Sequence, residues 1–372
     1  MTNDADVVVI GGGVMGTAAA RSLAERGRST VLLERSSIGH DRGSSGGPTR
    51  IFRLAYPDPF YVDLTRRALE RWRELEERAG ESLLITTGGI DAGEASRVCA
   101  DAMRATGVGC DEIDVAEAAE RWPAIRFDPG TPLFVHEEAG VCLVKRTLAA
   151  QTRLAREAGA TIVEGARVQS VRPRAREGGV DVVVDDGSAY RGATVVLAAG
   201  AWNAPLLEQV GVRAPLRPTF EQAVHYALDP TTPLPTLVDR STDPATPGYA
   251  VPNPLEPGEL KLGTHLGRVP IEPDALPTSP DAARLELDEA YAAERFPDAR
   301  ATGAIDTCMY TMAPDEDFVL DRVRDVVACS PCSGHGFKFA PLVGDVVADL
   351  VERKPTTIAL ERFASTRPSL AR

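Results

Sequence analysis

The chain contains 372 residues, of which 43% are hydrophobic and 26% are charged, a composition typical of a globular protein. With about 150 residues per domain as a guide, this length predicts two domains. The formal net charge is −13 without a basic stripe, which argues against a nucleic-acid partner. No apolar window approaches the roughly 18 residues of a membrane-spanning helix, so we expect no membrane association. The acidic first residues lack the pattern of a signal peptide, so we expect a cytoplasmic protein.

The first 35 residues predict a dinucleotide-binding unit. An apolar run at 6–10, typical of a buried parallel strand, leads into Gly11, Gly13 and Gly16, spaced as G-x-G-x-x-G at the start of a helix. These glycines permit a tight turn and let the backbone approach a pyrophosphate at the helix N-terminus, where free N–H groups favour negative charge. Glu34 ends the next strand about 20 residues on, where an acid accepts hydrogen bonds from a ribose hydroxyl.

The rest of the chain alternates predicted helices with short strands. In chain order we expect a glycine- and serine-rich loop at 36–48, helices at 60–78, 95–105 and 145–158, and strands at 161–164, 168–171, 180–184 and 194–198. The second half predicts strands at 222–228, 248–251 and 259–265, a helix at 281–295, strands at 304–312, 318–320 and 326–329, and a helix at 341–352.

These elements predict an α/β protein with two discontinuous domains. Residues 1–82, 145–216 and 319–372 are expected to form a doubly wound, Rossmann-like nucleotide-binding domain. Residues 83–144 and 217–318 are expected to form an inserted α+β substrate domain with an antiparallel sheet, because their strand-like pieces are separated by long loops rich in Pro, Thr and Asp.

Six scattered cysteines predict neither disulfides nor a metal site in a reducing compartment. Cys329 and Cys332 form a C-x-x-C that could be a redox pair or half a zinc site. No second C-x-x-C or suitable histidine pair accompanies it, so two small residues near a strand end are the favoured interpretation.

Lysine is rare, with four lysines among 41 basic residues. Lys261 lies in a core-like strand and Lys338 in a glycine-rich turn. A lysine in such a place indicates a specific role, because its compact ammonium can shift its pKa in a way that arginine cannot imitate. The alternative for Lys261 is a surface lysine on an edge strand.

Six stretches between residue 6 and about residue 365 resemble the monomeric sarcosine oxidases and N-methyltryptophan oxidases of the D-amino-acid-oxidase-like flavoproteins. They are the glycine motif with its Glu34-Arg35, TRIFRLAY at 49–56, AGAWN at 199–203, LKLGTH at 260–265, CMYT at 308–311 and SGHGFKF at 333–339. The resemblance implies FAD, with its isoalloxazine ring between the two domains.

The resemblance also implies which residues bind FAD: Gly11, Gly13, Val14, Met15, Gly16, Glu34, Arg35, Ser45, Thr49, Arg50, Val168, Gly200, Trp202, Cys308, Gly334, Gly336, Phe337 and Lys338. Cys308 matches the position that carries the flavin through a thioether, so covalent attachment is expected. The helix after Lys338 is expected to point its positive end at the flavin pyrimidine.

Seven residues match catalytic or pocket positions of that family. Lys261 is implied to activate O₂, since a fixed ammonium stabilises the negative charge that develops on oxygen, with Arg50 as a second cation beside the ring. Arg53 and Lys338 match the pair that binds the substrate carboxylate, which an arginine fork suits. The pocket positions over the flavin face are matched by His265, Tyr249 and Tyr310. His335 is expected to be a turn residue rather than an acid–base catalyst.

The implied activity is oxidation of a secondary amino acid, N-methyl or cyclic, to an imine, with O₂ reduced to hydrogen peroxide and with a monomer as the expected state. Three alternatives remain open: a cyclic imino-acid oxidase acting on a pipecolate- or proline-like ring, a dehydrogenase using another electron acceptor, and a non-catalytic flavin-binding protein. Two departures concern the substrate pocket. Glu221 stands where the family has a basic residue, and the loop at 229–247 is long and proline-rich.

Overall fold

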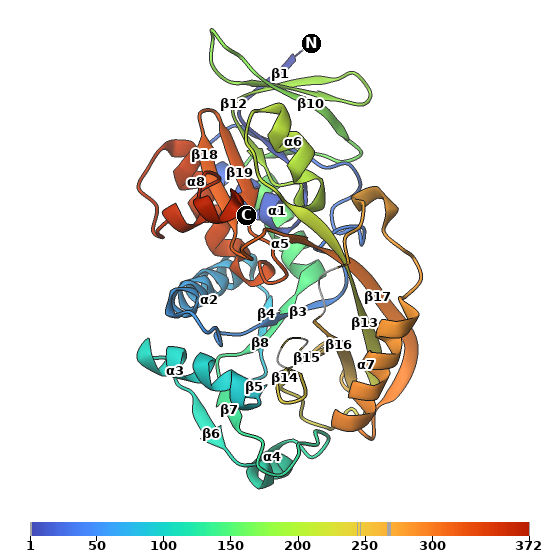
Figure 1. Ribbon diagram of the computed structural model, residues 1–372. Coiled ribbons are helices and arrows are strands. Elements are labelled where there is room, and N and C mark those ends of the chain that lie inside the picture. Colours follow the sequence, from blue (N-terminus) through green and yellow to red (C-terminus); the bar gives the residue numbers. More distant parts are fainter. Residues whose placement is uncertain (1, 244, 246, 266–268, 372) are drawn as a thin grey trace.

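The computed structural model describes residues 2–243, 245, 247–265 and 269–371, which form three β-sheets flanked by helices (Figure 1). The first large sheet has the order β10-β11-β12-β1-β2-β9, with β19 paired to β12 and β18 to β19. Its strands are β1 (Thr2–Ile10), β2 (Thr30–Leu33), β9 (Thr161–Val163), β10 (Val168–Pro173), β11 (Val180–Val184), β12 (Ala189–Leu197), β18 (Val319–Val323) and β19 (Val326–Ser330). The parallel pairs β1–β2, β1–β12 and β12–β19 confirm the doubly wound fold.

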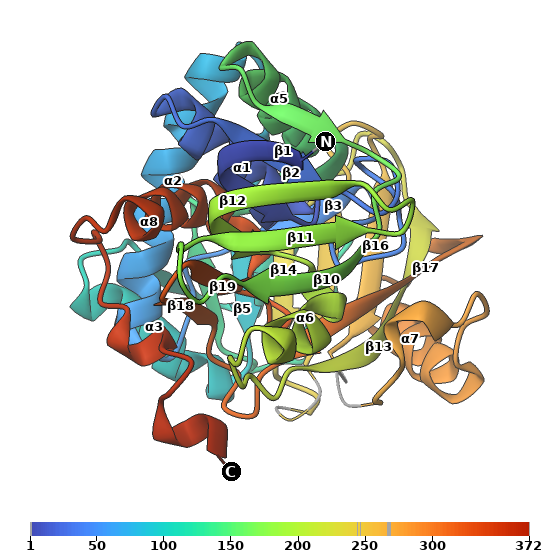
Figure 2. The ribbon, with the colours of Figure 1, turned by 90° about the horizontal axis from the view of Figure 1, so that it is seen from above.

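Helices cover this sheet closely. On one side, α1 (Val14–Glu25) contacts both α5 (Val144–Glu157) and α8 (Ala340–Glu352), and α6 (Asn203–Gln209) packs against β10 and β12 on the other (Figure 2). A Cβ added to Gly344 of α8 would lie 2.6 Å from the carbonyl oxygen of Ala18 in α1. Only glycine therefore allows these two helices to approach so closely.

The second large sheet has the order β17-β13-β16-β15-β14-β5-β7-β6 and is antiparallel except for the pair β14–β5. Its strands are β5 (Gly89–Ala92), β6 (Asp111–Ile113), β7 (Leu133–His136), β13 (Arg217–Ala227), β14 (Thr236–Asp239), β15 (Gly248–Pro252), β16 (Glu259–Thr264) and β17 (Arg300–Met312). Helix α7 (Ala282–Arg295) packs on β13 and β16 (Figure 1). Since β16 lies between β13 and β15, the edge-strand interpretation of Lys261 is wrong.

A small third sheet has the order β3-β8-β4. Its strands occur where the chain passes from one large sheet to the other. Its strands are β3 (Thr49–Phe52), β4 (Leu84–Thr86) and β8 (Gly140–Leu143), none of which the sequence pattern predicts as a strand. The remaining helices are α2 (Pro59–Ala79), α3 (Arg97–Ala105) and α4 (Val115–Arg121). Within the described ranges, no helix combines the length and the apolar character that crossing a bilayer demands.

The division into two domains stays a prediction. The strands of each large sheet fall within the residue ranges predicted for one domain, which supports that division. The small sheet combines β3 from one predicted domain with β4 and β8 from the other. This sheet brings residues 49–52, which the sequence analysis assigns to the cofactor site, close to the substrate side.

Candidate active site

The turn between β1 and α1 depends on its glycines. Gly11 has a φ of +104°, a conformation that glycine adopts without strain. A Cβ on Gly16 would lie 1.8 Å from the carbonyl oxygen of Gly11, so only glycine lets α1 pack this close to the turn. Gly13 is the N-cap of α1 and offers no side chain, and Ser45 Oγ instead accepts the N–H of Val14 at 3.1 Å. The helix N-terminus is thus accessible to a ligand along its backbone.

Glu34 lies directly after β2 and is almost fully buried. Its two carboxylate oxygens accept the N–H groups of Gly12 at 2.6 Å and Ser36 at 2.7 Å, and His40 Nε2 lies 3.4 Å away. Burial alone would raise the pKa of Glu34, but these hydrogen bonds outweigh burial and hold the pKa below its usual range. The residue is therefore an ionised acceptor next to the glycine turn.

A narrow cavity of about 410 Å³ extends from this acid along the turn. Among the residues that the resemblance implies for FAD, those lining it are Gly11, Gly13, Val14, Met15, Glu34, Arg35, Ser45, Arg50, Val168, Gly200, Trp202, Gly334, Gly336, Phe337 and Lys338. Gly16 does not line the cavity, because it faces the carbonyl oxygen of Gly11 and shapes the turn from behind.

Arg35 and Trp202 form one wall of this cavity although they are far apart in sequence. The Arg35 guanidinium lies 4.7 Å from the centre of the Trp202 ring. Asp274 joins the two, since Trp202 Nε1 donates to it at 2.9 Å and Arg35 pairs with it at 2.8 Å. Such a flat cation–aromatic wall suits a planar ligand group.

A second cavity of about 1280 Å³ adjoins the narrow one, and both are lined by Arg50, Tyr310, Gly334 and Lys338. Its walls also hold the remaining predicted residues, which are Thr49, Arg53, Tyr249, Lys261, His265 and Cys308. The structure therefore brings together along one connected space every predicted site residue except Gly16.

Lys261 is a buried cation in the wall of this large cavity. It lies in the middle of β16, only 7% exposed, and its Nζ donates to the carbonyl oxygen of Thr49 at 2.8 Å. Burial and, to a smaller extent, the neighbouring Arg50 lower the pKa of Lys261 to about 7, although Asp306 opposes both effects from 3.9 Å. Arg50 is anchored by donating to the backbone oxygens of Thr49 at 2.8 Å and Ser44 at 2.9 Å.

Arg53 and Lys338 lie against the same ring, that of Tyr56. The Arg53 guanidinium is 4.7 Å from the ring centre and Lys338 Nζ is 5.4 Å from it. Lys338 donates to Tyr56 Oη at 3.0 Å and to the carbonyl oxygen of His335 at 3.0 Å, while Arg53 donates to the carbonyl oxygen of Ala55. Burial, with Arg53 adding to it, lowers the pKa of Lys338 well below its usual value. Two cations therefore converge on one part of the cavity.

Cys308 and Tyr310 are presented by β17, two residues apart and thus on one face of the strand. Burial raises the pKa of the Cys308 thiol, and Arg50 opposes that effect. The ring of Tyr310 lies 5.5 Å from that of His265, and a Cβ on Gly334 would lie 2.8 Å from the Tyr310 ring. Gly334 has a φ of +77°, so both space and conformation demand glycine there.

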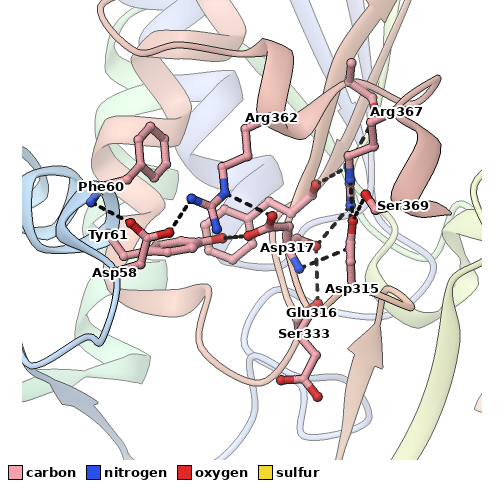
Figure 3. Close-up of polar contacts among 12 residues, drawn as sticks. Asp58, Phe60, Tyr61, Asp315, Glu316, Asp317, Ser333, Arg362, Arg367 and Ser369 are labelled. Carbon is pink, nitrogen blue, oxygen red and sulfur yellow. Dashed lines mark hydrogen bonds and ion pairs between the residues drawn. The ribbon is translucent and has the colours of Figure 1, made fainter. Parts of the chain in front are cut away.

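A cluster of charged residues, here called the acidic rim, contributes Asp58, Asp315, Asp317 and Arg362 to the wall of the large cavity. Figure 3 shows the polar contacts that join these residues to one another and to Arg367. Asp317 accepts from Tyr61 Oη at 2.7 Å and from Arg362 Nε at 2.9 Å, and Arg362 also pairs with Asp58. These contacts link the start of α2 to the segment between β17 and β18 and to the C-terminal segment. The sequence analysis did not identify this rim, since its members are ordinary charged residues until the fold brings them together.

Glu221, which stands where a basic residue was expected, pairs with an arginine of another element. Glu221 lines the cavity on β13, is 2% exposed, and pairs through Oε2 with Arg284 of α7 at 2.9 Å. Tyr56 and Arg240 also line the cavity and were not assigned a role from sequence. Tyr56 could have been identified from its place in the TRIFRLAY motif. Arg240 lies in the proline-rich loop, where no sequence pattern indicated a role.

All six cysteines are free, Cys329 is buried in β19, and Cys332 Sγ accepts the N–H of Thr311 at 3.2 Å. Among the residues that the structure describes, no group of three or more His, Cys, Asp or Glu side chains could hold a metal ion. His335 is half-buried, and its ring stacks on Phe318 at 4.7 Å with Nδ1 3.1 Å from Tyr56 Oη. Burial lowers its pKa well below the usual value.

The sequence matches the family model for FAD-dependent oxidoreductases over residues 6–350. The chain belongs to this family. A peroxisomal sarcosine oxidase of Mus musculus is 30% identical to this oxidoreductase over 97% of this chain and 96% of its own length. A monomeric sarcosine oxidase of Bacillus sp. (strain B-0618) is 31% identical over 100% of this chain and 98% of its own length. The structure of NikD, an unusual amino acid oxidase essential for nikkomycin biosynthesis, matches this oxidoreductase with a TM-score of 0.88 at 28% identity, covering 98% of each chain.

The cavity of this oxidoreductase fits FAD on its own geometry. The ionised Glu34 lies at the end where a ribose would bind, and the glycine turn leaves room beside the N-terminus of α1 for a pyrophosphate. The narrow cavity then adjoins the wide one at Arg50, Gly334 and Lys338, where a ring would meet substrate.

Proposed function

We propose that this oxidoreductase oxidises the C–N bond of a secondary amino acid, N-methyl or cyclic, to an imine and reduces O₂ to hydrogen peroxide. The observation that carries the proposal is the placement of four basic residues along one cavity: Arg53 and Lys338 beside Tyr56, and Lys261 beside Arg50. When bound, FAD supplies the redox chemistry, accepting a hydride equivalent from the carbon next to nitrogen and returning two electrons to O₂.

The pair Arg53 and Lys338 binds the substrate carboxylate in this proposal. The arginine fork provides two parallel donors and the ammonium a third from another direction. Lys338 is only 2% exposed, and a bound carboxylate would replace the missing solvation and favour its charged form. Fixing the carboxylate orients the amine-bearing carbon, and such positioning contributes several kcal/mol to catalysis.

The aromatic side chains Tyr249 and Tyr310, with His265, form the wall around the amine. Burial raises the pKa of both tyrosines, so they stay neutral hydrogen-bonding groups. Lys261 lies where its charge stabilises negative charge developing on oxygen, with Arg50 as a second cation. This cation favours O₂ over another electron acceptor, and the three sarcosine and amino acid oxidases above point the same way.

We further propose that FAD is attached through Cys308. The thiol lines the large cavity and is free. Acid precipitation of the purified protein should leave the yellow colour in the pellet, and Cys308→Ser should release it to the supernatant. Colour in the supernatant of the wild-type protein would show that no covalent bond forms.

Anaerobic mixing with a panel of N-methyl and cyclic amino acids tests the substrate class. We expect some members of the panel to bleach the flavin absorbance. The corresponding amines, which lack the carboxylate, should not bleach it. An inert flavin with every member would contradict the proposal and favour a non-catalytic role. A peroxide assay with and without an artificial acceptor separates oxidase from dehydrogenase.

Lys261→Met tests the oxygen site. Reoxidation of the bleached enzyme by O₂ should slow by at least about 100-fold, the scale of one preorganised charge, while bleaching by substrate changes little. Equal losses of rate in both half-reactions would contradict the assignment of Lys261 to the oxygen site.

We also propose that the protein is a monomer, because its Bacillus relative is named a monomeric sarcosine oxidase. Analytical ultracentrifugation tests this proposal.

A further inference from the structure

A row of alternating charges connects Lys261 to the protein surface. His225 on β13 lies directly opposite Lys261 on β16 in the strand register. Its Nδ1 is 2.7 Å from Glu259 Oε1, and its Nε2 is 3.1 Å from Asp306 Oδ2 on β17. The same Asp306 oxygen lies 3.9 Å from Lys261 Nζ. Three neighbouring strands therefore contribute to one row that starts at Glu259: β16 provides Glu259 and Lys261, β13 provides His225 and β17 provides Asp306.

The path has one end in solvent and one in the cavity. The side chain of Glu259 is 27% exposed, those of His225 and Lys261 are 8% exposed, and that of Asp306, in the cavity wall, is 34% exposed. Asp306 lines the large cavity together with Lys261 and Cys308. Protons can thus enter at Glu259 and reach the cavity without crossing apolar packing.

The charges along the row favour proton exchange at His225. Contact with Asp306 raises the pKa of His225, burial opposes it, Glu259 adds to the rise, and Lys261 lowers it. Burial would raise the pKa of Asp306, but His225, Lys261 and Arg50 together hold it below its usual range. The groups that face the row are thus Glu259 and Lys261 from β16, Asp306 from β17 and Arg50 from β3.

Reduction of O₂ to peroxide consumes a proton that this site must obtain. Two electrons and one proton come from the reduced cofactor, and the second proton must come from solvent, so that O₂ becomes H₂O₂. In the proposed function Lys261 is the group nearest that chemistry. A buried ammonium that gives up a proton needs another to replace it.

We propose that Glu259, His225 and Asp306 form the route by which this proton reaches Lys261. The inference rests on the proposed oxygen site. The contact between His225 and Asp306 is an ion pair rather than an aligned hydrogen bond, and the 3.9 Å to Lys261 exceeds hydrogen-bond length. Transfer therefore needs rotation of these side chains or one bridging water, either of which the adjoining cavity accommodates. His225, Asp306 and Glu259 act through Lys261 and are positioning residues.

The kinetic test measures reoxidation of the holoenzyme by O₂ as a function of pH in His225→Gln and Asp306→Asn. His225→Gln keeps a hydrogen-bond donor near Asp306 but cannot titrate. The wild-type rate should fall as pH rises through the pKa of His225. Both variants should be about 10- to 100-fold slower, with a flattened pH profile and a larger solvent isotope effect. Thr302→Val is the matched control, since Thr302 donates to the backbone oxygen of His225 and accepts the N–H of Ala304 but bonds to none of the side chains of the route, and it should keep the wild-type profile.

A second test needs no turnover. Among the five histidines, the ring signal of His225 is identified in NMR spectra of histidine-labelled holoenzyme by its absence from His225→Gln. The pKa of His225 should lie above its usual 6.5, should fall in Asp306→Asn, and should rise in Lys261→Met, because the positive charge is gone. The shift in Lys261→Met measures the electrostatic coupling between His225 and Lys261 that the route requires, and the pH profile of reoxidation separates the route from a purely structural histidine.

The outcomes separate the two proposals. If Lys261→Met leaves reoxidation unchanged, the proposed oxygen site is wrong. If Lys261→Met slows reoxidation but His225→Gln and Asp306→Asn keep the wild-type pH profile, only the proton route is wrong. A pKa of His225 that does not respond to Lys261→Met would likewise overturn the route.

Discussion

At the scale of single residues, the site depends on positions where only glycine fits and on positions where a charged side chain is buried. Gly16 and Gly336 are of the first kind, since a Cβ on either would lie 1.8 Å from a carbonyl oxygen. Lys261 and Lys338 are of the second kind, since burial opposes their charge. Substituting one of these residues therefore changes backbone packing or local charge, and each has its own measurable consequence.

Gly16→Ala should prevent FAD binding. The added methyl group must displace the Gly11 carbonyl, and overpacking of this kind costs about 3 kcal/mol. Urea unfolding gives the stability, and the ratio of flavin to protein absorbance gives the cofactor content. Gly109→Ala is the control, because nothing lies within 4 Å of its added Cβ. Full flavin content in Gly16→Ala would contradict the proposed role of the turn.

Lys261→Met should stabilise the protein below pH 7. The pKa of Lys261 is about 7 in the folded protein and 10.5 in an ordinary setting. Between these pH values the unfolded chain binds more protons, so wild-type stability rises with pH there, and the burial penalty is largest below pH 7. After subtraction of the contacts that Lys261 loses, the free energy of unfolding should increase by roughly 2–4 kcal/mol at pH 6. This increase should vanish near pH 10, where the lysine of the wild-type protein is neutral. Arg50 still satisfies the Thr49 carbonyl. Urea unfolding at both pH values provides the check.

At the scale of elements, the site depends on where strands and helices begin and which strands are neighbours. Helix α1 starts at a glycine and is capped from a distant loop by Ser45. Strand β16 places Lys261 inside the sheet between β13 and β15, so that the ammonium faces groups from three other strands. Short β3, paired with β8, carries Thr49 and Arg50 to that ammonium.

Ser45→Ala should weaken both α1 and cofactor binding. It removes the acceptor for the Val14 N–H at the start of the helix, which costs about 1 kcal/mol. The matched control is Asp114→Ala, which removes the cap of the exposed helix α4. Chemical unfolding should show a similar loss for both variants, but only Ser45→Ala should lower flavin content during expression. Equal flavin content in the two would contradict the role of Ser45 beside the cofactor.

At the scale of the molecule, the last segment of the chain joins parts that are distant in sequence. Arg362 connects Asp58 and Asp317, and Arg367 holds Asp315 at 2.7 Å (Figure 3). Asp58, Asp315, Asp317 and Arg362 line the large cavity, so these pairs join the C-terminal segment to the cavity wall.

Asp315→Asn should destabilise the protein at pH 7 by an amount that shrinks in acid. Burial would raise the pKa of Asp315, but Arg367 and Ser369 lower it to about 2. A carboxylate with a lowered pKa contributes stability above the unfolded value of 3.8, which is lost as pH falls towards 2. Thermal unfolding at pH 7 and pH 3 measures the change. Asp101→Asn is the control, since that side chain is 65% exposed and should matter little at either pH.

Much of the fold could be predicted because its signals are local. The apolar run before Gly11, the periodic helix now assigned to Pro59–Ala79, and the strand at Val326–Ser330 were all visible as patterns of neighbouring residues. The strands β3, β4 and β8 were missed, because each is only three or four residues long and acquires its partners from far along the chain. The site residues carried by motifs could be named from sequence, whereas their roles remain to be tested.

The sequence by itself determined the cofactor class, since a glycine turn followed by an acid is a local requirement of backbone geometry and charge. Only the tertiary structure decided that Lys261 is interior and that Glu221 pairs with Arg284. It also decided that His225 and Asp306 meet Lys261 across three strands. The physical reason is that burial and ion pairing depend on which strands are neighbours, and strand order is set by long-range packing that no short stretch of sequence contains.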